Sequence, residues 1–261
     1  MLLTAALSMY AQCGAVNNAI QSGERLDYKL KFNWGIIWIN VGWASMTVND
    51  TICDGEPCLR TDLESYTNKR ADSFFKMRDT LTSITSANLE PRFFRKAAEE
   101  GSHYTVDEAH FSYTEGKCIV DQWRTKKGVT REAHDVCDNC VYDMLSILAQ
   151  ARSYDPSDYT EGMKIHFAMA TGKRVEEQTL IYRGKKTYKA ENDVKYRCLV
   201  FSLVEYNSKG KEDEVITFYV TDDLNHLPVR LDLYLSFGSA KAFLTEIKGN
   251  RHPLTSIIED D

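Results

Sequence analysis

Polar and apolar residues alternate with a period of two along most of this chain. Leu26, Tyr28 and Leu30, for example, are separated by charged residues, as expected for a strand with one buried and one solvated face. The same alternation predicts strands over 24–33, 35–48, 59–67, 80–86, 92–98, 103–114, 117–125, 164–170, 174–182, 185–190, 194–205, 214–221, 227–237 and 240–248. Short turns rich in Gly, Asn and Asp separate many of these segments, so we expect an antiparallel meander.

One segment departs from this period. Between 138 and 152, apolar residues recur at the spacing of an amphipathic helix, with Asp138 or Asn139 available as its N-cap. The apolar positions are Val141, Met144, Leu145, Leu148 and Ala149. A second, shorter helix is predicted over 72–78, where aromatic residues cluster.

A large antiparallel sheet must close on itself or protect its edges, and one helix can plug the open side of a curved sheet. We therefore predict a mainly β fold, with one domain over 13–261 and the helix at about 138–152. The antiparallel meander would form an incompletely closed barrel or a strongly curved sheet, with the amphipathic helix as its lid. The side chains predicted to line a ligand cavity are Trp43, Phe111, Trp123, Met144, Leu145, Leu148, Phe201 and Phe218. A barrel interior filled with side chains is the alternative.

Charge and hydropathy restrict the partners. With 32 Lys and Arg against 38 Asp and Glu, the net charge is −6, the wrong sign for a protein whose partners are nucleic acid or anionic lipid headgroups. No uncharged apolar run reaches the roughly 18 residues of a membrane helix. We expect no nucleic-acid partner and no transmembrane span.

The N-terminal segment indicates export. Residues 1–12 carry no charge and end in Ala11-Gln12, which resembles the end of a secretory signal peptide with cleavage after Ala11. A buried N-terminal strand is the alternative. Lipidation of Cys13 is disfavoured, because the residue before it is Gln12 rather than a small residue. The expected location is the periplasm or the outer-membrane periphery of a Gram-negative bacterium.

Seven cysteines in an exported chain allow disulfides. Cys53 and Cys58 flank turn-forming residues, so this pair is the predicted disulfide. Cys137 and Cys140 form a CxxC motif that we interpret as a structural bridge or free thiols. A redox pair, or half a zinc site with His134 completed by Cys118 or His110, is the weaker alternative because acidic residues surround the motif and a second ligand cluster is absent.

No catalytic signature indicates an enzyme. The sequence lacks GxSxG, HExxH, a phosphate-binding loop and a dinucleotide fingerprint, and we predict no cofactor and no metal. The favoured hypothesis is a non-enzymatic carrier of an apolar small molecule, such as a lipid or acyl chain, in the concave sheet. The alternative is a glycan- or protein-interaction module that uses Trp34, Trp38 and Trp43. A hydrolase with a triad assembled from distant positions is least favoured.

The C-terminal half carries a family resemblance. Residues 140–148, 219–230 and 235–244 resemble the bacterial domain-of-unknown-function family 3108, and the resemblance extends over 23–249. Its most specific parts are Asp143 with Ser146, the hairpin that contains Asp222 and Asp223, and the segment 238–240. The resemblance implies an exported protein of Gram-negative bacteria, with a cleavage pattern similar to that of Bacteroidetes, and it implies no catalytic residue. We interpret Asp222, Asp223 and Asn225 as a turn rather than a calcium site, because an EF-hand loop needs a Gly and a distal Glu.

Overall fold

The fold is described from a computed structural model of the chain, which defines residue 13 and residues 16–34, 37–191, 193–207, 210–235 and 238–259. Within these residues, sixteen strands form one sheet, accompanied by two helices. No helix in the described part of the chain has the length and apolarity needed to span a lipid bilayer. The predicted signal segment 1–12 lies outside the described residues.

The strands and helices follow one another in chain order as β1 Arg25–Trp34, β2 Ile37–Cys53, β3 Glu56–Thr67, α1 Lys69–Asp72, β4 Met77–Ser86, β5 Pro91–Glu100, β6 His103–Thr114, β7 Lys117–Lys126, β8 Val129–Cys137, β9 Val141–Tyr142, α2 Met144–Arg152, β10 Lys164–Ala170, β11 Val175–Lys189, β12 Lys195–Tyr206, β13 Glu212–Thr221, β14 Pro228–Leu235, β15 Gly238–Lys248 and β16 Ile257–Ile258.

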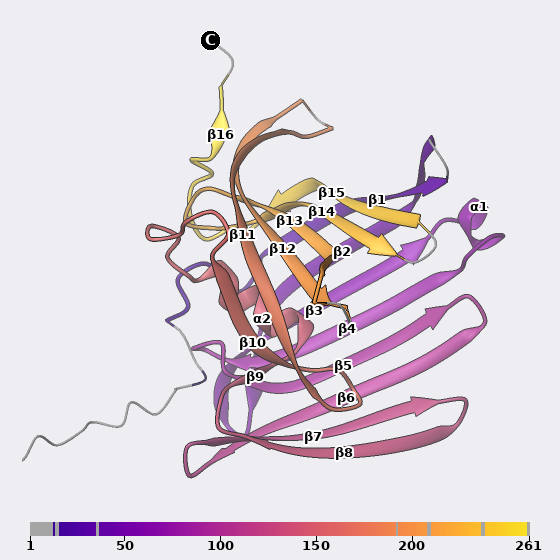
Figure 1. Cartoon of the computed structure of the whole chain (residues 1–261), viewed down its shortest axis with the longest axis vertical. Helices are drawn as coiled ribbons and strands as arrows, with labels where there is room; N and C mark the ends of the chain where they lie inside the picture. The colour runs from indigo at the N-terminus through magenta and orange to yellow at the C-terminus, as the bar shows by residue number, and fades with distance from the viewer. Residues whose placement is uncertain are drawn as a thin grey trace, which may run out of the picture.

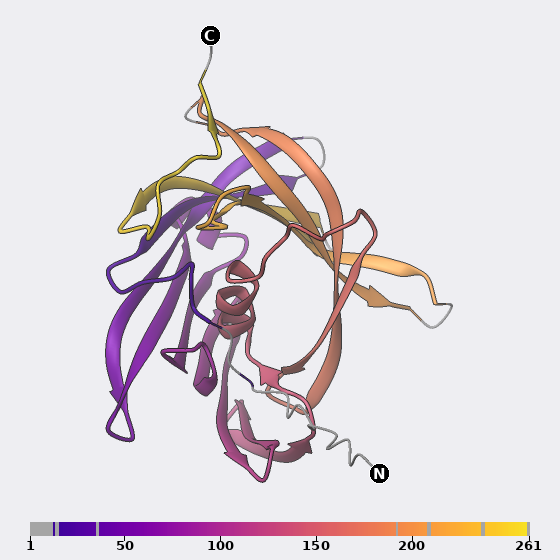
Figure 2. The same cartoon turned by 90° about the vertical axis from the view of Figure 1, so that its left-hand side faces the viewer.

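The sheet is a meander folded back on itself. Its strand order is β8-β7-β6-β5-β4-β3-β2-β1-β15-β14-β13-β12-β11-β10-β9, with β16 added to β12. The first and last halves of the chain join where β1 pairs antiparallel with β15. Figures 1 and 2 show that the sheet curls into a nearly closed barrel, whose one unsealed seam lies between the two terminal strands, β8 and β9. The predicted incompletely closed barrel is thus confirmed.

Local sequence explains why the hairpins are tight. β2 buries Ala44, Met46 and Val48 on one face, in the alternation of a half-buried strand. The turn between β2 and β3 consists of Asp54 and Gly55, both with positive φ (53° and 83°). Such two-residue turns match the twist of the flanking strands and so fix their register.

Two strand predictions and one helix prediction were wrong. β8, Val129–Cys137, was not predicted, because it is an edge strand with no fully buried position. The separate strands predicted over 174–182 and 185–190 form one strand, β11, in which a bulge takes up the extra residues between Tyr182 and Lys185. The predicted helix over 72–78 is replaced by the single turn α1, which ends at Asp72, and β4 begins at Met77.

Helix α2 lies inside the ring of strands (Figure 2). It starts at Met144 rather than near 138, because Asp143 is its N-cap. The Asp143 carboxylate accepts hydrogen bonds from the backbone amides of Leu145 and Ser146. In return, the backbone amide of Asp143 donates to the Ser146 hydroxyl. Val141, predicted to be helical, instead belongs to β9. The helix is thus pinned to the sheet, since Ser83 of β4 donates to Asp143 Oδ2 at 2.9 Å.

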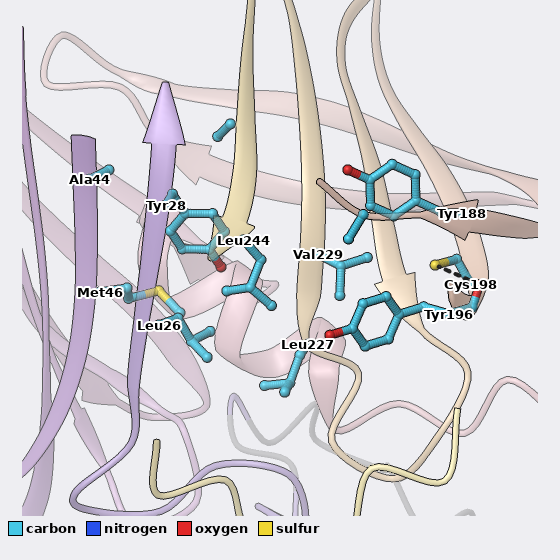
Figure 3. Close-up of a cluster of buried hydrophobic side chains, with 12 residues drawn as sticks. Leu26, Tyr28, Ala44, Met46, Tyr188, Tyr196, Cys198, Leu227, Val229 and Leu244 are labelled. Atoms are coloured by element: carbon cyan, nitrogen blue, oxygen red, sulfur yellow. Dashed lines mark hydrogen bonds between the residues drawn. The ribbon is translucent and has the colours of Figure 1, made fainter. Parts of the chain in front are cut away.

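The largest buried apolar cluster joins the two halves of the sheet. Figure 3 shows side chains of β1 and β2 meeting those of β12, β14 and β15, with Tyr28, Leu244 and Val229 near its centre. The Tyr28 hydroxyl donates to the Pro228 carbonyl at 3.0 Å. Near it, Arg152 at the end of α2 forms a buried two-pronged ion pair with Glu24, at 2.6 and 2.8 Å. The ion pair holds the residue that precedes β1 against the end of α2.

Candidate functional site: a basic cleft at the barrel seam

The seam is closed by side chains instead of a strand ladder. The amide of Gly172, in the turn between β10 and β11, donates to Gln122 Oε1 on β7 at 2.9 Å. Gln122 is fully buried, and its Nε2 donates to Asp135 Oδ2 on β8 at 3.0 Å. This chain of hydrogen bonds attaches the β10–β11 turn to the opposite side of the seam.

Glycine is required at position 172 for two reasons. Its φ is +77°, in the left-handed region that glycine adopts without strain. A Cβ there would also lie 2.7 Å from Cγ of Asp107, closer than nonbonded atoms approach. The turn therefore packs directly against the Asp107 side chain.

A basic cleft of about 630 Å³ lies between this turn and the β7–β8 hairpin. Its lining residues are Arg124, Lys126, Lys127, Val129, Arg131, Glu132, Gly172 and Lys173. Because Arg124 is opposite Arg131 in the β7–β8 ladder, the two guanidinium groups project from the same face of the hairpin. Five cations and one carboxylate thus share one concave surface.

Most of these cations form no salt bridge with another side chain among the described residues. Arg124 Nε lies 3.4 Å from Asp107 Oδ1. Lys126, Lys127, Arg131 and Lys173 make no hydrogen bond through their side chains and no ion pair within the described part of the chain. Asp107 itself is buried, and burial raises the pKa of its carboxyl, opposed by the charges of Arg124, Lys96 and Lys173. Unpaired like charges in a cleft repel one another, so the site is electrostatically suited to an anion.

The residues predicted to line a cavity lie in different parts of the structure. Phe111 and Leu145 are buried together in a second apolar cluster under the seam, and Leu148 packs partly buried against the main cluster. Phe201 and Phe218 are partly buried and pack, together with Tyr159, against a separate small cluster.

The other three predicted lining residues are not in the interior clusters. Trp43 is 42% exposed and stacks on Tyr66 with ring centroids 5.9 Å apart. Trp123 meets His110 edge to face. Met144 is 44% exposed, because the capping box places it at the first position of α2 with its side chain away from the buried face.

The cysteine pairing differs from the prediction. Cys53 and Cys58 are free thiols, because the two-residue turn pairs Cys53 with Glu56 and leaves Cys58 as its diagonal neighbour. Diagonal positions are about 7–8 Å apart, too far for a disulfide. Cys140 bonds with Cys13, across 127 residues of sequence, and Cys137 is free.

The two cysteines of the CxxC motif do not bond with each other, because Cys140 is already joined to Cys13. His134 lies opposite Asp121, and its Nδ1 is 2.7 Å from the Asp121 carboxylate. Burial and the carboxylates of Asp135, Glu177 and Asp138 raise the pKa of Cys137, the reverse of what an activated redox thiolate requires. No group of three or more metal-binding side chains occurs among the described residues.

The motifs that carried the family resemblance form structural junctions. Asp223 Oδ1 accepts from the Thr221 hydroxyl and the Asn225 amide, and its Oδ2 accepts from the amide of Ser256. The Asn225 side chain donates to the His252 carbonyl and accepts from the His252 amide. The β13–β14 turn therefore holds the C-terminal segment in place.

Sequence reasoning missed the cations of the cleft. Four of them, Arg124, Lys126, Lys127 and Arg131, surround a Lys-Gly hairpin turn, and this local density of basic residues was the available signal. Lys173 is remote in sequence and joins them only because the barrel closes.

Comparisons with known proteins show a similar fold and a family. A crystal structure of a beta-barrel-like protein of domain of unknown function DUF1849 from Brucella abortus is similar, with a TM-score of 0.56 at 10% sequence identity, covering 90% of this chain and 98% of that one. This likeness identifies the fold alone, a β-barrel-like architecture. The chain belongs to the family described as protein of unknown function, DUF3108, which matches residues 27–245.

Two further findings complete the comparisons. A putative exported protein with a YmcC-like fold from Bacteroides fragilis has a TM-score of 0.36 at 9% identity, covering 90% of this chain and all of that one (100%). A search of curated proteins finds no match.

Proposed function

We propose that this protein is an exported, non-enzymatic binding protein of the Gram-negative cell envelope, and that it holds a phosphate-bearing anionic ligand in the basic cleft. The observation that carries the proposal is the gathering of Arg124, Lys126, Lys127, Arg131 and Lys173 around one cleft, in a chain whose net charge is −6. Holding these like charges together costs free energy, and a bound anion offsets that cost.

The size and lining of the cleft support a small anionic ligand. A volume of about 630 Å³ lies within the range of small-molecule sites. Val129 is the sole large apolar residue in the lining, whereas charged side chains dominate. The cleft therefore favours a phosphorylated sugar or a lipid headgroup over an acyl chain. The apolar ligand predicted from sequence stays a prediction, and the side chains proposed to line its cavity are dispersed.

A binding role is favoured over catalysis by the same lining. It contains no Ser, Cys or His, so it offers no nucleophile paired with a base. Cations placed on rigid strands can position phosphate groups through charge-assisted hydrogen bonds, which arginine forms in pairs.

Titration calorimetry tests the cleft with two soluble probes of different origin: glycerol phosphate, and dihexanoyl phosphatidylglycerol below its micelle concentration. Lys126→Gln with Arg131→Gln should weaken binding of the preferred probe at least tenfold, because two of the five cations are lost. The matched control, Lys69→Gln with Arg70→Gln, removes two exposed charges from α1 and should bind as wild type. Binding by phosphatidylglycerol alone identifies a lipid headgroup, and binding by glycerol phosphate identifies a free phosphate. Failure of both probes, or unchanged binding in the cleft variant, would overturn the proposal.

Export is tested separately. If the chain is processed after Ala11, protein isolated from the envelope of its source should begin at Gln12 or its cyclised form. Intact mass distinguishes both processed forms from the unprocessed chain. A chain that still begins at Met1 contradicts export through this segment.

A second candidate, a glycan- or protein-interaction module, rests on the exposed stacked pair of Trp43 and Tyr66. Such rings form platforms for sugars and for partner proteins. Trp43→Ala should then abolish retention on a glycan array without altering binding of anions to the cleft. A wild-type protein that no glycan on the array retains would leave this candidate without a glycan function.

A further inference from the structure

Four cysteines meet in one apolar cluster beneath the seam. Cys13 and Cys118 are buried members of this cluster, and Cys137 and Cys140 pack against it. Cys13 and Cys140 form the disulfide, with their Cα atoms 4.9 Å apart. Cys118 and Cys137 are free thiols. One disulfide and two thiols therefore share a single site.

The two thiols are placed to bond with each other. Cys118 of β7 and Cys137 of β8 are directly opposite in the antiparallel ladder, so their side chains project from the same face. Directly opposite Cβ atoms lie about 4.5–5.5 Å apart, close to the separation a disulfide spans. A small side-chain adjustment can join them.

Cys118 also lies beside the existing disulfide. The backbone amide of Val141 hydrogen-bonds the Cys118 sulfur, and Val141 directly follows Cys140 in the chain. The Cys118 sulfur thus has Cys137 opposite it and the Cys140–Val141 peptide next to it.

We propose that these four cysteines form an intramolecular thiol–disulfide exchange centre that moves the bond from Cys13–Cys140 to Cys118–Cys137. The Cys118 thiolate attacks the Cys140 sulfur, forming a Cys118–Cys140 bond and releasing Cys13 as a thiolate. The Cys137 thiolate then attacks the Cys118 sulfur, forming Cys118–Cys137 and releasing Cys140. Two protons pass from Cys118 and Cys137 to Cys13 and Cys140, so electrons balance without an external oxidant.

The exchange decides whether Cys13 is covalently attached to Cys140, the residue that directly precedes β9. In the starting state, the Cys13–Cys140 bond joins the N-terminal segment to the strand β9 and helix α2. After exchange, the single disulfide joins β7 to β8 instead. Burial raises the pKa of Cys118 and of Cys137, which keeps both thiols protonated at neutral pH and makes the exchange slow there.

Disulfide mapping tests the proposal on the full chain. Purified oxidised protein is held without oxygen at pH 8.5, quenched with acid, alkylated after unfolding and digested. We expect the Cys13–Cys140 peptide to decline while Cys118–Cys137 appears in equal amount. Cys137→Ser should stop at the mixed Cys118–Cys140 bond, which traps the intermediate. Cys58→Ser, which removes a buried free thiol outside the cluster, should exchange like wild type.

Two results would overturn the exchange. One is a wild-type protein that keeps Cys13–Cys140 intact, with Cys118 and Cys137 fully alkylated after hours at pH 8.5. The other is an equal loss of the Cys13–Cys140 bond in Cys118→Ser, which would assign the rearrangement to a different thiol.

Discussion

Two buried carboxyl groups face the interior side of the β4–β6 region. Asp79 and Asp107 are each 8% exposed, and each has one carboxylate oxygen without a hydrogen bond among the described residues. Burial, reinforced by Glu100, raises the pKa of Asp79 from 3.8 to about 6. Both residues therefore favour the neutral form more than an exposed aspartate does, which links the stability of the protein to pH.

Asp79→Asn should stabilise the protein at neutral pH. The raised pKa means that the folded state binds this proton more tightly than the unfolded state, so wild-type stability falls as pH rises from about 4 to about 6. The asparagine side chain does not ionise, so the variant does not lose this stability. Its gain in unfolding free energy over wild type should be near zero at pH 3.5 and reach at most about 3 kcal/mol above pH 6. Urea unfolding across this range measures it. The control Asp158→Asn, at an exposed position, should leave the pH profile unchanged, and an identical profile in Asp79→Asn would contradict the argument.

The disulfide partners could not be predicted from the residues around each cysteine. The turn formers between Cys53 and Cys58 correctly predicted a hairpin, but the choice of a two-residue turn fixes which residues face each other, and that choice paired Cys53 with Glu56. The bond between Cys13 and Cys140 spans 127 residues. Nothing local to either cysteine encodes it, because it depends on the N-terminal segment reaching the seam.

At the scale of elements, the spacing of polar and apolar residues alone predicted most strands, but it did not predict where α2 begins. The apolar spacing continues smoothly through Val141, whereas the capping box of Asp143 and Ser146 determines where helical hydrogen bonding begins. Asp143 and Ser146 were recognised as family positions, and their physical role as a cap is visible only with the helix in place. β8 escaped detection because an edge strand with polar residues on both faces carries no alternation.

Neighbouring residues of α2 give a matched test of which face it buries. Leu145 is 4% exposed and Met144 is 44% exposed. Leu145→Ala should cost about 2–5 kcal/mol of unfolding free energy, because it opens a cavity among Leu81, Phe111 and Val120. Met144→Ala should change stability by no more than about 0.5 kcal/mol, as surface substitutions usually do. Chemical denaturation of both variants compares them, and equal losses would place the apolar face elsewhere.

At the scale of the whole molecule, closure of the sheet creates the basic cleft, which the sequence alone does not predict. The basic segment around the β7–β8 turn is a local feature, but it becomes a cleft only because the β10–β11 turn crosses the seam and brings Lys173 to it. The net charge of −6 argues against binding to a broad anionic surface, and it remains compatible with one compact anion in a positively lined cleft. The net charge of the whole chain does not show how unevenly the fold distributes charge over the surface.

The affinity of the cleft for an anion should rise as pH falls. Asp107 lies beside Arg124 and Lys173, and burial raises the pKa of its carboxyl. On acidification it takes up a proton before an ordinary carboxyl does, which removes a negative charge next to the cleft. One charge at this range is worth about 1 kcal/mol, or on the order of fivefold in affinity. Phosphodiester probes such as phosphatidylglycerol keep their own charge between pH 5 and 7, so a change in their affinity reports on the protein.

Asp107→Asn separates this effect from other titrations. The variant carries no charge at position 107 at any pH, so it should bind the phosphodiester at pH 7 about as tightly as wild type does once Asp107 is protonated, with a flattened pH dependence. Asp158→Asn, exposed and absent from the cleft lining, should keep the wild-type pH dependence. Calorimetric titrations at pH 5, 6 and 7 compare the three proteins. If Asp107→Asn binds no more tightly than wild type at pH 7 and follows the same pH profile, the charge of Asp107 does not act on the cleft.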